Sequence, residues 1–190
     1  MTNQTKLLPA RSVQEQALYL LVQPCQKCRS GPLEEVSRQQ SDSPTGKIDM
    51  IQARCSSCGA EVALQFARSV KEKATDQSEL IDVTEWLALC HHFLDLGQTN
   101  SEKQQTQQQI GLARYCLSEA LKFYPKDSDL PAPSAFFGRL ANQRFKEHPA
   151  AFLKTKLLEL RRQLPALSVG TSEYKPADAQ KKRKWWRTKE

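Results

Sequence analysis

Apolar residues recur along the chain with two different periods. From residue 24 to residue 68 they alternate with polar ones, as in VALQF at 62–66, which predicts strands. The cluster SDSPTG at 41–46 is typical of a turn between the strands LEEV and KIDMI. After Ser78 the apolar residues recur every three or four positions, which predicts helices. The pattern therefore indicates an α+β chain, with a hairpin and a third strand first and helices afterwards.

The segment before the strands has a weaker pattern. Residues 1–11 are polar, and we expect them to be disordered. In SVQEQALYLLV, residues 12–22, four apolar residues lie at helical spacing, which favours a short leading helix, although YLLV at 19–22 could equally form a strand. Within KIDMI, Ile48 and Met50 alternate with Asp49 and Ile51, which predicts a strand with one apolar face.

Four helices are predicted between residues 77 and 165. The first carries an apolar stripe, is capped by Asp76 or Ser78, and ends at Gly97. The glutamine-rich residues 98–109 have no apolar face and are predicted to form a loop or a frayed helix start. The other helices are expected at about 107–123, around Phe136 to Phe145, and from His148-Pro149 to Pro165.

Composition adds a basic C-terminus to this picture. Apolar residues make up 39% of the 190 residues and charged residues 26%, so part of the length is expected to be unfolded. The net charge is +7, and residues 175–190 carry +5 of it, which leaves +2 for the residues before them. We expect attraction to polyanions to be strongest in the segment 166–190, which has too little apolar patterning to fold.

The chain has no apolar run of about 20 residues, the length needed to span a bilayer, and no signal-peptide pattern at its start. A cytoplasmic location is therefore expected. Six cysteines in a reducing compartment are poor candidates for disulfides, so paired thiols favour metal or redox chemistry.

Two CxxC pairs carry the sharpest chemistry. Cys25 and Cys28 are separated by 26 residues from Cys55 and Cys58, which is enough for a two-stranded hairpin and its loop. Two residues between thiols let both sulfurs point into one turn, so each pair supplies half of the tetrahedron that Zn²⁺ prefers. Gly59 can adopt a positive φ and turn amides towards the sulfurs. A redox role is less favoured, because thioredoxin-like CxxC motifs begin a helix in an α/β pattern.

These residues resemble a zinc ribbon over residues 20–68, although Arg29 follows Cys28 and the glycine comes later, at Gly31. The resemblance implies a structural Zn²⁺ held by four cysteines, which leave no open position for water or substrate. So small a ribbon needs its metal to fold.

The helical half resembles a tetratricopeptide repeat. Ala113, Leu117, Ala120 and Pro125 are spaced as in the second helix of such a repeat, and the run WLALCHHF at 86–93 is similar to the first. The polar stretch between them makes the unit longer than a regular repeat, and an unrelated helical bundle is the alternative. The resemblance implies a scaffold that binds protein partners. A ribbon followed by repeat-like helices also resembles architectures of uncharacterised bacterial proteins, which implies no activity.

Other candidate residues give weaker indications of function. Neighbours on a helix point about 100° apart, so Cys90 is expected in the core and His91 on the surface, and not as a catalytic pair. Cys116 is likewise expected in the core. No nucleophile motif, phosphate loop or carboxylate pair is found, so we expect no enzymatic activity.

The tail KKRKWWRTKE mixes cations with two tryptophans. Such a tail could bind nucleic acid, with the cations on phosphates and the tryptophans stacked on bases. The residues concerned are Lys181, Lys182, Arg183, Lys184, Trp185 and Trp186. It could instead contact an anionic membrane surface, dock into a protein groove, or merely solubilise the chain. The sequence thus predicts a non-catalytic zinc-binding adaptor for a protein partner, with nucleic-acid binding as the alternative.

Overall fold

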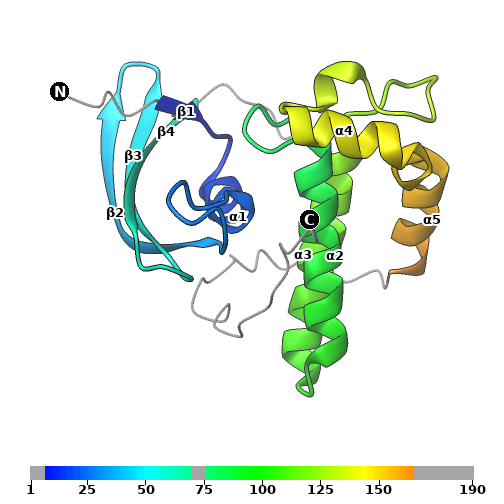
Figure 1. Cartoon of the computed structure of the whole chain (residues 1–190), viewed down its shortest axis with the longest axis horizontal. Helices are drawn as coiled ribbons and strands as arrows, with labels where there is room; N and C mark the ends of the chain where they lie inside the picture. Colours follow the sequence, from blue (N-terminus) through cyan, green and yellow to red (C-terminus); the bar gives the residue numbers. More distant parts are fainter. Residues whose placement is uncertain (1–6, 70–75, 165–190) are drawn as a thin grey trace. The chain divides into compact units, whose positions relative to one another are not determined.

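The computed structural model describes residues 7–69 and 76–164 (Figure 1). These residues belong to two separate units, which we call the sheet unit, residues 7–69, and the helical unit, residues 76–164. The basic tail predicted at 166–190 lies outside the described residues, as do residues 1–6.

The sheet unit is a four-stranded sheet with one helix. Its strands lie in the order β1-β4-β3-β2; β3 is antiparallel to both β2 and β4, and β1 is parallel to β4. In chain order the elements are β1 (Leu7–Pro9), α1 (Val13–Val22), β2 (Leu33–Ser43), β3 (Gly46–Cys55) and β4 (Glu61–Ser69). The expectation that residues 1–11 are disordered is wrong for Leu7–Pro9. Their partner strand β4 lies almost sixty positions later in the chain, so a local pattern gave no sign of the pairing.

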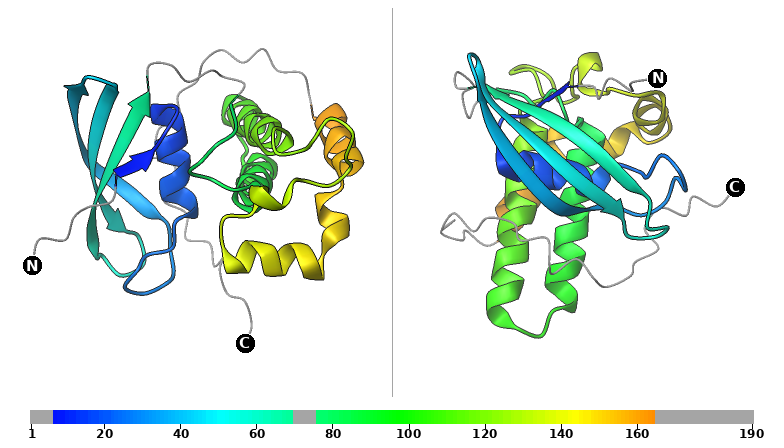
Figure 2. Two further views of the ribbon diagram at one scale, coloured as in Figure 1. Left: turned by 90° about the horizontal axis from the view of Figure 1, so that it is seen from above. Right: turned by 90° about the vertical axis from the view of Figure 1, so that its left-hand side faces the viewer.

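The segment 12–22 forms a helix and not a strand. Ser12 caps α1, since its hydroxyl accepts a hydrogen bond from the amide of Glu15 at 3.0 Å. The helix lies across one face of the sheet (Figure 2). Leu18 is fully buried there, and the ring of Tyr19 meets Phe66 of β4 edge to face, with 5.8 Å between centroids.

The predicted hairpin is present, but its strands are longer than the sequence indicates. Only Pro44 and Thr45 connect β2 to β3, because the polar residues before them continue β2. The buried face of β3 carries Asp49, Ile51 and Ala53, whereas Met50 is 42% exposed. The side that α1 covers therefore includes a charged residue.

Asp49 is fully buried and is satisfied by hydrogen bonds. Its carboxylate accepts from Arg68 Nε at 2.5 Å, from Gln16 Nε2 at 2.7 Å and from Gln40 Nε2 at 2.8 Å. Burial alone would raise the pKa of Asp49, but these hydrogen bonds outweigh it and lower the pKa to about 2. The network ties α1, β2 and β4 to β3.

The helical unit begins with a hairpin of two long helices, α2 (Val83–Thr99) and α3 (Lys103–Leu121). Asp82 caps α2 in a capping box with Glu85, so the expected caps at Asp76 and Ser78 are wrong. The expected stop at Gly97 is also wrong, because this residue lies inside α2, where a Cβ would approach Ile110 of α3 at 3.5 Å.

The glutamine-rich segment is mostly helical, which agrees with the predicted helix start and not with the alternative of a loop. It forms the first turns of α3, and only residues 100–102 join the two helices. The core between the helices is apolar. Its fully buried members include Trp86, Cys90 and Phe93 of α2 and Ala113, Cys116, Leu117 and Ala120 of α3.

Shorter elements complete the helical unit: η1 (Pro133–Ala135), α4 (Arg139–Glu147), η2 (Pro149–Phe152) and α5 (Lys154–Gln163). Pro149 thus opens one 3-10 turn and not the long helix that was expected. Phe136, Phe145 and Phe152 pack together, with ring centroids 4.7 to 5.6 Å apart. None of the helices in the described ranges combines the length and apolarity that crossing a bilayer requires.

Candidate metal centre

The four cysteines of the two CxxC pairs meet at one end of the β2–β3 hairpin. Leu33, the first residue of β2, pairs with Cys55, the last residue of β3. The antiparallel register therefore brings the segment before β2, with Cys25 and Cys28, beside the turn after β3, with Cys58. The two pairs are 26 residues apart in sequence but close in space, because the hairpin between them folds back on itself.

The sulfur positions fit a tetrahedral ion. All four Sγ atoms lie within 4.8 Å of one another. The Sγ atoms of Cys25 and Cys58 are 3.7 Å apart, and those of Cys28 and Cys55 are 3.6 Å apart. A tetrahedron with Zn–S bonds of about 2.3 Å has edges of about 3.8 Å, so both distances match an edge.

The two cysteine turns share the same backbone hydrogen bond and the same backbone conformation. The amide of Arg29 donates to the carbonyl of Cys25 at 2.7 Å, and the amide of Gly59 donates to the carbonyl of Cys55 at 2.9 Å. Both donors have a left-handed backbone, with φ of 54° at Arg29 and 70° at Gly59. Arg29 therefore has the backbone conformation that Gly59 has in the second turn, although it is not a glycine. Aligning the two CxxC motifs would have revealed this strained position.

Gly31 lets the two turns approach closely. Its φ is 73°, and a Cβ placed there would lie 2.2 Å from the hydroxyl oxygen of Ser57, which belongs to the other cysteine turn. At Gly59 a Cβ would meet no atom within 4 Å. Gly31 is thus required by contact as well as by backbone conformation, and Gly59 by conformation alone.

Nearby amides and sulfurs shift the pKa values of Cys25 and Cys58 in opposite directions. A hydrogen bond from the amide of Cys28, with further help from Lys27 and two thiols, lowers the pKa of Cys25 to about 6. The amide of Ala60 lowers the pKa of Cys58, but burial and the three other sulfurs outweigh it and raise that pKa to about 11. A bound cation would favour the thiolate form of the cysteines that hold it and would release their protons.

The centre lies at the edge of the sheet unit. Cys25 and Cys55 are buried, Cys28 is half-buried and Cys58 is exposed. A divalent ion here would be held by two buried and two accessible sulfurs, with all four tetrahedral positions filled by the protein. Such a site stabilises structure and leaves no position for a reacting molecule.

Other candidate residues do not join this cluster. Cys90 and Cys116 are fully buried in the helical unit, and His91 is exposed, as predicted. Burial raises the pKa of Cys90 to about 12, so at neutral pH it is a thiol and not a nucleophilic thiolate. The candidate nucleic-acid residues, 181–186, lie outside the described residues.

Comparisons with known proteins give no match: no protein-family model, no curated protein sequence and no solved structure is significantly similar to this chain. Any function must therefore be argued from the chain's own residues.

Proposed function

We propose that this chain is a non-catalytic zinc protein in which a structural Zn²⁺ fastens the sheet unit and the helical unit serves as an adaptor for a protein partner. The observation that carries the proposal is the convergence of Cys25, Cys28, Cys55 and Cys58 within 4.8 Å. Zn²⁺ fits this donor set best, because four thiolates at tetrahedral spacing favour it over the hard cations that prefer oxygen.

The metal assignment is tested by the metal content of the full-length protein. We expect one zinc per chain by plasma mass spectrometry, and loss of the metal in Cys55→Ser. Cys90→Ala is the matched control, because Cys90 is also a buried thiol but lies in the helical unit. Metal-free wild-type protein with an ordered sheet unit, or equal zinc loss in the control, would overturn the assignment.

A structural role is separated from a catalytic one by cobalt substitution. Co²⁺ bound to four thiolates gives tetrahedral d–d absorption bands, and a closed ligand set leaves those bands unchanged when imidazole or cyanide is added in modest excess. A shift of the bands would show an open position and would favour an enzyme.

The adaptor role rests on the resemblance to repeat helices and on the α2–α3 hairpin. Its helices, 17 and 19 residues long, are longer than the repeat pattern implies, and their exposed sides are polar and carry residues such as His91 and Gln107. We propose that a protein partner binds this hairpin in the cytoplasm, where a reducing environment keeps the cysteines available for the ion.

Affinity purification with nuclease treatment tests the adaptor role. The expected partner survives deletion of residues 166–190 and is lost from the double variant His91→Glu and Gln107→Glu, which alters only exposed hairpin residues. Loss of the partner on nuclease treatment or on tail deletion would contradict a protein adaptor and would favour nucleic-acid binding.

A further inference from the structure

Charge is unevenly distributed within the helical unit, and the total for the chain hides this. Residues 76–138 contain nine acidic and four basic residues, a net charge of −5. Residues 139–164 contain seven basic and two acidic residues, a net charge of +5. The nearly neutral total expected for the folded part therefore conceals one acidic and one basic segment, and the basic segment coincides with α4 and α5.

The cations of α4 and α5 are available to a ligand. Six of the seven are exposed, and Lys154, the seventh, donates to the carbonyl of Pro125 at 3.0 Å. Within residues 76–164 only Arg162 among them forms an ion pair, with Glu159 at 2.8 Å. Arg144 interacts electrostatically with Asp82 and Glu85. We call the remaining exposed cations the basic face, and they are Arg139, Lys146, Lys156 and Arg161.

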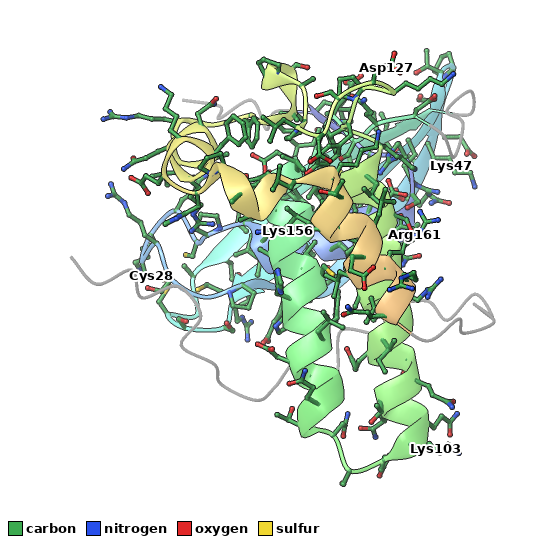
Figure 3. All side chains as sticks on the ribbon, turned by 90° about the vertical axis from the view of Figure 1, so that its right-hand side faces the viewer. Cys28, Lys47, Lys103, Asp127, Lys156 and Arg161 are labelled. Carbon is green, nitrogen blue, oxygen red and sulfur yellow. The ribbon has the colours of Figure 1, made fainter. Side chains whose placement is uncertain are left out.

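The basic face spans both helices. Arg139 and Lys146 lie seven positions apart, two turns along the same side of α4, opposite the buried Ala141. Lys156 and Arg161 lie along α5 (Figure 3). Cations repeated along two connected helices fit a ligand with regularly repeated negative charge better than they fit a single anion.

An exposed aromatic side chain precedes these cations in the chain. Phe137, two residues before Arg139, is 48% exposed. Its backbone is fixed, because its amide donates to Asp82 Oδ2 at 3.3 Å, and its ring meets Phe123 with 6.2 Å between centroids. A held aromatic ring beside cations can stack on an unpaired base while the cations contact phosphates.

We propose that the basic face and Phe137 form a binding surface for single-stranded nucleic acid. The sequence after α5 carries charge of the same sign, since residues 165–190 contain a further +4. The last 52 residues thus carry +9 and the first 138 carry −2. Binding is not sequence-specific, since the contacts are with phosphates and with the face of a base.

The test uses full-length, metal-loaded protein and a fluorescein-labelled oligonucleotide of about 20 thymidines, with binding followed by anisotropy. We expect binding at about 50 mM salt that weakens steeply towards 200 mM, because each phosphate contact adds about −0.7 to the slope of log K against log salt. The quadruple variant Arg139→Glu, Lys146→Glu, Lys156→Glu and Arg161→Glu should bind at least about tenfold more weakly, with a shallower slope.

Matched controls locate the surface. The double variant Lys47→Glu and Lys103→Glu reverses exposed cations elsewhere in the chain and should bind within about threefold of the wild type. Phe137→Ala should weaken binding about fivefold or more without changing the salt slope, because stacking carries no charge. Leu158→Ala, which removes a 43% exposed aliphatic side chain of α5, should leave binding unchanged.

Deletion of residues 166–190 separates the basic face from the tail. The truncated protein should still bind, and the quadruple substitution should still weaken it. Binding that disappears with the tail alone, or a quadruple variant that is folded and binds like the wild type, would overturn the proposal. Binding to vesicles of phosphatidylcholine and phosphatidylserine, or to polyglutamate, but not to the oligonucleotide would overturn it as well and would assign the face to a membrane or to an acidic protein.

Discussion

The sheet unit and the helical unit bury very different residues. Beneath α1 the sheet buries Asp49 beside Ile51 and Phe66, and hydrogen bonds from three side chains compensate that charge. Between α2 and α3 the core is built from Trp86, Phe93 and small or aliphatic residues. The helical unit also buries Asp82 and Glu119, but these acids lie at helix ends, where the amide of Glu85 and the ammonium of Lys122 donate to them. A core with a buried charge depends on every one of its partners, whereas an apolar core loses stability gradually as contacts are removed.

The comparison suggests why the candidate metal centre lies in the sheet unit. A unit of about 60 residues buries little apolar surface, and part of this core is polar. Four thiolates on one ion connect the segment before β2 to the turn after β3 and can supply the missing stability. The helical unit has no cysteine cluster of this kind among its described residues.

Removal of the metal should have the largest effect. A chelator, or Cys55→Ser, should unfold the sheet unit, because a structural zinc site contributes on the order of 10 kcal/mol in comparable small domains. Hydrogen exchange resolved by mass spectrometry should show lost protection in residues 7–69 and unchanged protection in residues 76–164. Equal loss in both units would show that they fold as one.

Asp49→Ala should have the second largest effect on the stability of the sheet unit. It leaves the guanidinium of Arg68, which is about four-fifths buried, without its carboxylate, at a cost of about 3 kcal/mol. The contribution of Asp49 is complete at pH 7, because its folded pKa of about 2 is below the ordinary value, and it is lost only as the pH falls from about 4 towards 2. Urea denaturation of metal-loaded protein at pH 7 measures it, and Asp42→Ala, at an exposed site on β2, should change little.

Alanine substitutions at the two glycines of the cysteine turns, Gly31 and Gly59, should differ in their effect on stability and metal binding. Gly59→Ala has free space for its Cβ and should cost about 1 kcal/mol for the left-handed backbone alone. Gly31→Ala meets Ser57 as well and should weaken metal binding much more, as measured by competition with a chelator. Ser57→Gly should restore part of the loss in Gly31→Ala, and equal effects of the two alanines would contradict the close approach.

Asp129 should stabilise the helical unit by a smaller amount. Its carboxylate accepts hydrogen bonds from the amide of Thr155 at 2.8 Å and from the Thr155 hydroxyl at 3.1 Å, and so caps α5 from a distant segment. Asp129→Ala should cost about 1 kcal/mol and raise hydrogen exchange in α5. Asp127→Ala, at an exposed position two residues earlier, should have no such effect.

Glu85 should give the helical unit a weak pH dependence of its own. Burial and the neighbouring Asp82 raise the pKa of Glu85 to about 7, so its contribution is complete below about pH 4.5 and is lost as the pH rises to about 7. Glu85→Gln keeps an acceptor for the amide of Asp82 and should raise the melting temperature of the helical unit at pH 8 by a few degrees, on the order of 1 kcal/mol. A lower melting temperature would show that the carboxylate is needed in its charged form.

Local patterns predicted the elements better than their ends. Helical spacing located α1, α2 and α3, because one apolar side is enough to indicate a helix. The ends were missed where another segment decides them. Gly97 continues α2 because α3 packs against it, and the glutamines that begin α3 lack an apolar stripe of their own.

The candidate metal site was predictable to the residue, and the basic face was not. Two CxxC pairs separated by a hairpin length specify a four-sulfur cluster, because the spacing fixes each turn and the hairpin closes the distance. The cations of α4 and α5 were hidden in a total in which acidic residues elsewhere cancel them. Counting charge by segment would have found them.

The amino-acid order alone determined the two periods of the chain, the four thiols and the amount of charge, because these depend on neighbours within a few positions. Only the tertiary structure decided that β1 joins β4, that Asp49 is buried with Arg68 and that Asp129 caps α5. The physical reason is that the paired strand, the cap and the buried charge each have a partner distant in sequence. Side-chain and strand pairing of this kind leaves no periodic trace along the chain.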